Sequence, residues 1–373
     1  MTGTAATNDR ERATAGRRLP YELARGLANR PREQACRDLR LALVLTPGDP
    51  DLNALALWHL LRCHRVEPAT LRRINRLLVV VRLLDRPLTT GNAFEACVLA
   101  RQATQEQSDP HLFFRYATVA HACGMIAFWD RYGRSLSVEH HGRRYDLRVG
   151  DAQVSFNVAG PQLGLFFDFF FVHEPGMWAW LAEMSPSDVL LDVGANVGLY
   201  SIAAAGLRGC RSIGLEPFPV NIDSATANIA MSGLSDCVRM LPVAAAARSG
   251  SGRLSHREVI PGVAAQAFHG EHDAAAPGDA QIEVEGAAID DLVERGAIPF
   301  PTHVKIDVDG GEDGVIAGME RTLADPRLDS VRMEIRWWEP GKQAVVDRLK
   351  RHGFEPKVDD DRKNLLFRRS WPS

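Results

Sequence analysis

The fold is decided by the stretch Val189-Leu190-Leu191-Asp192-Val193-Gly194-Ala195-Asn196-Val197-Gly198-Leu199-Tyr200-Ser201. Its first residues form an apolar run that predicts a buried strand, and this strand runs into a glycine turn that opens a helix. Glycine permits a tight turn and lets the backbone approach a ligand, because it has no Cβ. The spacing G-x-x-x-G lacks the G-x-G-x-x-G pattern that cradles a pyrophosphate. The loop therefore suits a ligand with an amino-acid tail and a nucleoside.

An acidic residue ends the second predicted strand, near 211–216. Glu216 follows Gly198 by eighteen positions and is expected at an exposed strand end. In nucleotide-binding sheets an acid at this place accepts hydrogen bonds from ribose hydroxyls. An ordinary sheet with a capping acid is the alternative interpretation, but the order of glycine turn, helix and acid favours a nucleoside site.

A third segment combines a lysine with several acids, Val304-Lys305-Ile306-Asp307-Val308-Asp309-Gly310-Gly311-Glu312. Alternation along a strand places Lys305, Asp307 and Asp309 on one face. Crowded acids beside a lysine are expected to have shifted pKa values, which suits removal of a proton from an attacking hydroxyl. Glu334, near the end of the next strand, could join them. The alternative is a buried ion pair that only fixes the strand end.

These segments together resemble the FkbM-type methyltransferases, whose motifs occur in the same order with similar separations. The resemblance covers roughly residues 170–370 and departs from the family at Ala244–Ala247, where serine and aspartate are usual. It implies an α/β fold, the class I methyltransferase (Rossmann-like) mostly parallel sheet with its last strand antiparallel, and S-adenosyl-L-methionine as methyl donor. The cofactor-binding residues it implies are Asp192, Gly194, Ala195, Asn196, Gly198, Glu216, Pro217, Asn221 and Val243.

The predicted function is O-methylation of a hydroxyl on a small-molecule, sugar or lipid acceptor. The expected catalytic residues are Lys305, Asp307, Glu312 and Glu334, with Asp307 as base or acceptor-orienting group. Two alternatives stay open. One is a catalytically degenerate scaffold whose helical part binds a protein partner, and the other is an RNA methyltransferase that holds phosphates with its arginine-rich N-terminal part.

The chain is expected to divide into four parts. Residues 1–18 form a disordered tail, and residues 19–133 form an all-helical, repeat-like domain that resembles tetratricopeptide repeats. Residues 134–187 form a hairpin and a lead-in segment, and residues 188–370 form the methyltransferase domain. Strands are predicted near 188–193, 211–216, 238–244, 303–308, 330–335 and 363–368. A pair of helices is predicted over 35–62, broken at 46–50, and further helices near 68–84, 91–104, 111–130, 198–208, 219–232, 311–324 and 341–352. The insert 250–300 is predicted to hold a hairpin and a helix at 288–296.

Composition excludes several classes of protein. The formal net charge of −3 provides no large basic field, so a nucleic-acid partner is not expected. The six cysteines are scattered without the close pairs of a zinc site, and no metal is expected. The apolar runs are too short to span a bilayer, and the N-terminus lacks the apolar core of a secretory signal. A cytoplasmic location is the simplest expectation.

Overall fold

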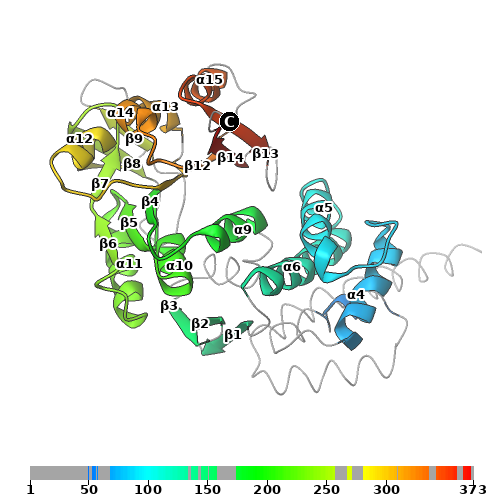
Figure 1. Cartoon of the computed structure of the whole chain (residues 1–373). Helices are drawn as coiled ribbons and strands as arrows, with labels where there is room; N and C mark the ends of the chain where they lie inside the picture. The colour runs from blue at the N-terminus through cyan, green and yellow to red at the C-terminus, as the bar shows by residue number, and fades with distance from the viewer. Residues whose placement is uncertain are drawn as a thin grey trace, which may run out of the picture. The chain divides into compact units, whose positions relative to one another are not determined.

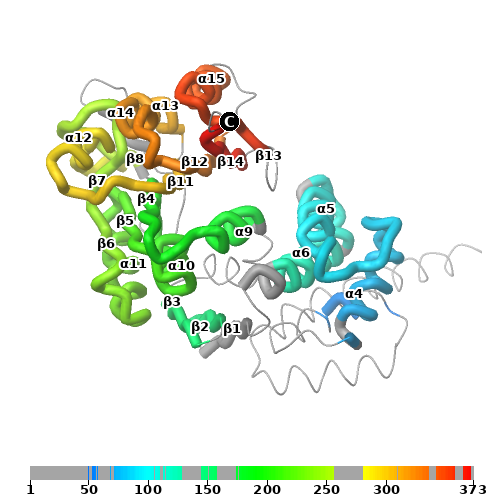
Figure 2. Tube along the Cα trace, viewed as in Figure 1, coloured from blue at the N-terminus to red at the C-terminus, as the bar shows by residue number. Residues whose placement is uncertain are grey.

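The computed structural model describes residues 49, 53–55, 57, 68–132, 136–141, 144–149, 151–157, 174–256, 267–270, 280–308, 310–335, 342–358 and 364–370. The chain divides into two compact units, Met1–Glu139 with Phe169–Trp178 and His140–Asp168 with Ala179–Ser373. Figure 1 labels the helices and strands, and Figure 2 follows the Cα trace through both units. The tail expected at 1–18 lies outside the described residues, as does most of the helical pair expected at 35–62.

The first unit is helical where it is described. Its elements are α4 (Pro68–Val81), the short 3₁₀ helix η1 (Thr90–Asn92), α5 (Ala93–Gln105) and α6 (Pro110–Tyr132). Small side chains such as Ala96, Ala100 and Ala120 are fully buried, so α5 and α6 can pack closely against each other. These helices fall near the predicted ranges, whereas a tetratricopeptide-like repeat is not confirmed.

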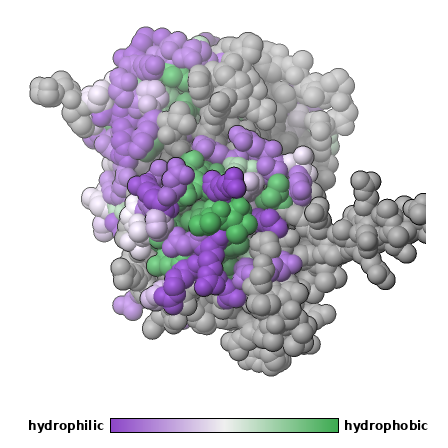
Figure 3. Space-filling view, turned by 90° about the vertical axis from the view of Figure 1, so that its right-hand side faces the viewer, coloured by the Kyte–Doolittle hydropathy of each residue, from purple (hydrophilic) through white to green (hydrophobic). Residues whose placement is uncertain are grey.

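Part of this helical unit presents apolar side chains to solvent. Val79, Val80 and Phe113 are exposed by 73%, 54% and 48%. Figure 3 shows one face of the molecule, on which apolar residues are bordered by hydrophilic ones. No helix in the described part of the chain is both long and apolar enough to cross a membrane.

A three-stranded sheet precedes the main sheet along the chain. Its strands are β1 (Leu136–His141), β2 (Arg144–Val149) and β3 (Ala152–Asn157), in that order, with β2 and β3 antiparallel. The sequence predicted a hairpin over the first two strands and missed the third. β3 is also hydrogen-bonded to the following domain, because the backbone N–H of Ser155 donates to Ser232 Oγ at 2.9 Å.

The main sheet has seven strands in the order β13-β14-β12-β11-β4-β5-β6. Neighbouring strands are parallel except where β14 meets β12 and β13, so β14, the last strand of the chain, runs antiparallel to the rest. This topology confirms the predicted class I methyltransferase sheet. The strands are β4 (Val189–Val193), β5 (Arg211–Leu215), β6 (Val238–Leu241), β11 (His303–Ile306), β12 (Ser330–Glu334), β13 (Phe354–Val358) and β14 (Asn364–Arg369).

The two faces of this sheet differ chemically. One face buries an apolar core in which Leu191, Val304 and Val331 pack with the helices α12 to α15. The opposite face carries polar groups, among them Asp192, Lys305 and Arg332, each at most 4% exposed. The helices are α9 (Pro175–Glu183), α10 (Leu199–Arg208), α11 (Pro219–Met231), α12 (Ile289–Glu294), α13 (Glu312–Ala317), α14 (Glu320–Ala324) and α15 (Gln343–Arg351).

Several elements of the second unit differ from the sequence prediction. Pro242 has no N–H for a strand ladder, and the strand predicted at 238–244 is two strands, β6 and β7 (Val243–Ala245). β7 belongs to a second sheet, of order β7-β10-β8-β9, with β8 (Gly250–His256), β9 (Ala267–Gly270) and β10 (Ala280–Ala287). The helix predicted at 311–324 is divided into α13 and α14. β13 was not predicted.

The break between α13 and α14 lies where the chain touches the strand region of the second sheet. A Cβ added at Gly318 would lie 2.1 Å from the carbonyl oxygen of Ala246. The Ala246 backbone cannot move aside as the end of a flexible side chain can. Only glycine therefore allows this contact without a shift of one chain against the other.

We predict that Gly318→Ala destabilises the protein by about 1–3 kcal/mol, because the added methyl group overpacks a contact with backbone. The melting temperature should fall by several degrees, at about 2–4 °C per kcal/mol. Gly314→Ala is the matched control, since its added Cβ would come no closer than 3.7 Å to Ala247 N. A melting temperature that falls equally in both variants would contradict the overpacking argument.

Candidate active site

The predicted site residues meet at the carboxyl ends of four neighbouring strands, β5, β4, β11 and β12. In the strand register Lys305 pairs with Asp192 on one side and with Arg332 on the other. Paired residues of neighbouring strands project from the same face of the sheet. The polar face described above therefore leads directly to the strand ends, where open α/β sheets bind their ligands.

The glycine loop after β4 is held in a compact form by left-handed backbone conformations. Gly194, Asn196 and Gly198 have φ values of +76°, +50° and +81°. The backbone N–H groups of Gly194 and Ala195 donate to the Leu215 carbonyl at 3.0 and 3.1 Å. At Gly194 an added Cβ would lie 2.0 Å from the Asp307 carbonyl oxygen, so the loop and the end of β11 touch through backbone.

Glu216 is buried, not exposed as the sequence predicted, with 4% of its surface accessible. One carboxylate oxygen accepts from Asn196 N at 2.9 Å, and the other accepts from Phe218 N at 2.9 Å and Asn221 Nδ2 at 3.3 Å. Burial raises the pKa of Glu216 above its ordinary value, although these hydrogen bonds oppose the shift. The carboxylate closes the glycine loop, and a carboxylate has about four acceptor positions, so one more donor can still bind.

A buried ionic cluster connects the loop to the end of β11. The Lys305 ammonium lies 3.2 Å from Asp192 Oδ1 and 3.3 Å from Asp307 Oδ2, and it donates to the Gly194 carbonyl at 3.2 Å. It also lies 5.3 Å from the centre of the Tyr200 ring. Asp192 has no exposed surface, and its other oxygen accepts from Ser201 N and Oγ. A ligand contact by Asp192 itself therefore stays a prediction.

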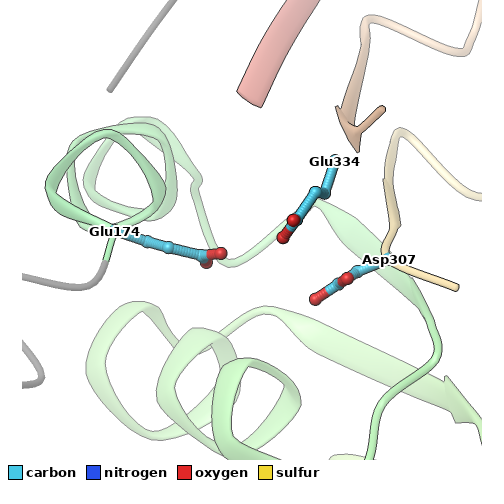
Figure 4. Close-up of side chains that lie close together, drawn as sticks. All are labelled: Glu174, Asp307 and Glu334. Carbon is cyan, nitrogen blue, oxygen red and sulfur yellow. The ribbon is translucent and has the colours of Figure 1, made fainter. Parts of the chain in front are cut away.

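Asp307 and Glu334 are the accessible acids of the cluster. The Asp307 side chain is 40% exposed, and its carboxylate lies within 4.8 Å of that of Glu334. Figure 4 shows the two side chains extending toward each other from the ends of β11 and β12. Lys305 is beside this pair but only 4% exposed, so the acids, and not the ammonium, are presented to a ligand.

Glu312 is not free to act on a ligand. It is 6% exposed, one oxygen accepts from Gly310 N at 3.2 Å, and the other accepts from Lys342 Nζ at 2.6 Å. The hydrogen bonds of Glu312 thus indicate that it stabilises the turn after β11, whereas the sequence predicted a catalytic role. Asp309, which the sequence places on the same strand face, lies outside the described residues.

Sequence reasoning missed two side chains. Lys342, at the start of α15, is far from the motifs in sequence, and its type alone carries no signal. Asn228 is 1% exposed on α11; its amide donates to the Val197 carbonyl at 3.1 Å, and its oxygen accepts from Asn157 N at 2.8 Å. It thus connects the glycine loop to β3. The available signal was an asparagine between the apolar residues Ala227 and Ile229 of a predicted helix.

The remaining predicted cofactor residues occupy supporting positions. Ala195 and Val243 are 4% and 6% exposed, Asn221 is fully buried against Glu216, and Pro217 is half-buried. The loop does leave one group for a ligand. The buried Oδ1 of Asn196 has no hydrogen-bond partner among the described residues, although an orphaned buried acceptor is costly. An ammonium or hydroxyl donor of an amino-acid and nucleoside ligand would satisfy it, so these residues fit S-adenosylmethionine.

Comparison with known proteins bears on the same segment. Residues 192–356 match the model of the methyltransferase FkbM domain. The chain is 32% identical over 145 residues to the hexuronic acid methyltransferase AglP of Haloferax volcanii. These 145 residues are 38% of this chain. The match spans 54%, about half, of the length of that relative.

Solved structures give distant similarities. A methyltransferase from Agrobacterium tumefaciens matches with a TM-score of 0.35 and 13% identity, over 62% of this chain and 71% of that one. Fibrillarin from Aeropyrum pernix matches with a TM-score of 0.32 and 12% identity, over 62% of this chain and 98% of that one. The similarity to the FkbM domain therefore rests on the sequence match and not on these structures. Residues 192–356 are thus similar to the methyltransferase FkbM domain, and S-adenosylmethionine is the methyl donor that fits a domain of this kind.

Proposed function

We propose that this domain transfers a methyl group to a hydroxyl oxygen of a sugar or similar polyhydroxylated acceptor. When bound, S-adenosylmethionine supplies an electrophilic methyl group on a sulfonium, which needs little covalent help from the protein. The protein has to hold the acceptor oxygen in line and remove its proton. The observation that carries the proposal is the accessible Asp307 carboxylate beside the glycine loop.

Asp307 is the proposed base. Its backbone is fixed, since its N–H donates to the Val193 carbonyl at 3.0 Å and its carbonyl oxygen packs against Gly194. Its side chain is 40% exposed and can reach a hydroxyl. With the cofactor bound, the Asp307 carboxylate would take the proton of the acceptor hydroxyl as the oxygen–methyl bond forms. The sulfur–methyl bond would break at the same time and leave a neutral thioether, so no further group has to ionise.

Lys305 orients this base. Its ammonium lies between Asp192 and Asp307 and also contacts the loop carbonyl of Gly194, so the three groups share one cation. The position of the base is thereby tied to that of the cofactor loop. Glu334, whose carboxylate faces that of Asp307, is placed to accept a hydrogen bond from a second hydroxyl of the acceptor.

The name of the Haloferax volcanii relative supports a sugar acid as the acceptor class. Methylation of a hydroxyl of such an acceptor needs a base to remove the proton, whereas methylation of its ionised carboxylate needs none.

A protein partner for the helical unit, and small-molecule or lipid acceptors other than sugars, stay predictions. The degenerate scaffold would bind no cofactor, and the RNA methyltransferase would bind RNA with a strong salt dependence.

We predict that Glu216→Gln weakens binding of S-adenosylhomocysteine by about 10- to 100-fold, the loss of roughly 1.5–3 kcal/mol for hydrogen bonds to a charged group. The amide would also face backbone N–H groups that now donate to a carboxylate. The pKa of Glu216 is raised, so lowering the pH protonates it at pH values above those at which an ordinary carboxyl titrates. The affinity of the wild type should therefore decrease as the pH is lowered through this range, and the affinity of the variant should not. Calorimetric titration measures both.

Asp223→Asn, an exposed change of the same kind on α11, is the matched control and should bind normally. Melting curves without ligand separate weak binding from misfolding. Normal affinity in the Glu216 variant would remove that residue from the ribose role. Absence of binding by the folded wild type would favour the scaffold interpretation.

We predict that Asp307→Asn lowers kcat by about 10²–10⁴-fold, the usual contribution of a general base, and changes the affinity for S-adenosylhomocysteine less than about threefold. Turnover is measured as S-adenosylhomocysteine release with methyl glucuronide and methyl glucoside as acceptors. Products are treated with mild alkali, which cleaves a methyl ester and leaves a methyl ether intact.

Asp347→Asn, an exposed acid on α15, serves as the control. Alkali-stable product and loss of turnover in the Asp307 variant alone are expected. Undiminished turnover with an alkali-labile product would overturn the hydroxyl assignment in favour of transfer to a carboxylate.

A further inference from the structure

Lys342 donates hydrogen bonds to the turn that follows β11. It precedes α15, and its ammonium donates to Glu312 Oε2 at 2.6 Å, to Asp313 Oδ2 at 3.0 Å and to the Gly310 carbonyl at 3.3 Å. All three acceptors belong to residues 310–313. An ammonium has three protons, so these contacts use its donor capacity fully.

The turn is organised around the same lysine. Gly310 has φ +96°, and its N–H donates to Glu312 Oε1 at 3.2 Å and to the Val308 carbonyl at 2.8 Å. Glu312 therefore bridges the turn and Lys342 with its two oxygens. Burial by itself lowers the pKa of Lys342, but its hydrogen bonds to Glu312 and Asp313 raise the value above the ordinary one. Lys342 stays protonated at neutral pH.

The same turn begins at Asp307. Its first residue is held from the other side by β4, since Asp307 N donates to the Val193 carbonyl and Asp307 O packs on Gly194. Lys342 holds the far end through Gly310 and Glu312. The segment that carries the proposed base is thus hydrogen-bonded to its surroundings at both ends, and at the far end the donor is Lys342.

We propose that Lys342 is a positioning residue, which fixes the turn 310–313 and thereby the direction in which Asp307 meets the acceptor. The inference rests on the proposed function of Asp307. Lys342 takes no part in proton transfer, because its ammonium is engaged by the turn and its side chain is 19% exposed. A displacement of about 1 Å in a group that orients a reaction can cost about 10²-fold in rate.

The test compares Lys342→Met and Lys342→Arg with Lys350→Met, an exposed lysine on the same helix. Lys342→Met is expected to lower kcat with methyl glucuronide about 10- to 100-fold while KM and the affinity for S-adenosylhomocysteine change less than about threefold. Lys342→Arg should recover most of kcat, because a guanidinium can bridge the same acceptors. Lys350→Met should match the wild type.

Hydrogen exchange tests the turn without an acceptor. In Lys342→Met the amides of residues 310–315 should exchange at least about tenfold faster than in the wild type, with those of β4 and β5 unchanged. Unchanged exchange at the turn, or losses of kcat and cofactor affinity in equal proportion, would overturn the positioning role. A wild type without turnover on any acceptor would contradict the proposed function instead, and exchange would still decide whether Lys342 holds the turn.

Discussion

The ammonium of Lys305 is the interaction on which the site depends. A charge with 4% exposure is costly in a protein interior unless it is paired and hydrogen-bonded. Lys305 meets this requirement with Asp192, Asp307 and the Gly194 carbonyl, which come from two strand ends and the loop between β4 and α10. Removing the lysine would leave a buried Asp192 without its cation. The cluster therefore holds the cofactor loop and the proposed base in one arrangement.

The chemistry of the sheet explains why the cluster is located where it is. One face is apolar and packs against α12 to α15, where it buries a large apolar core. The opposite face can then carry charged groups in register, Asp192 beside Lys305 and Lys305 beside Arg332. The charges end at the carboxyl edge, where Asp307 and Glu334 emerge toward solvent. The domain thus separates the residues that stabilise it from those that bind and react.

Support for the site comes from residues remote in sequence. Asn228 fastens the glycine loop to β3, and Lys342 fastens the turn after β11 to α15. Glu216 closes the loop by accepting hydrogen bonds from the backbone N–H groups of Asn196 and Phe218. Each contact uses a buried or half-buried polar group that is satisfied by backbone or by an opposite charge, as native interiors require. Preorganisation of this kind lowers the cost of orienting two reactants.

The strand, glycine turn and acid of the cofactor loop can be predicted from the sequence, because apolar periodicity, glycine spacing and short-range order are local properties. It also identified Lys305 and Asp307 as neighbours on one strand face. Tertiary structure alone decided that Glu216 is buried, that Glu312 belongs to a turn and that Lys342 and Asn228 support the site. It also divided the strand at Pro242 and the helix near Gly318. The burial of a side chain and its hydrogen-bond partners depend on which distant segments pack together, and the pattern within one segment does not show those contacts.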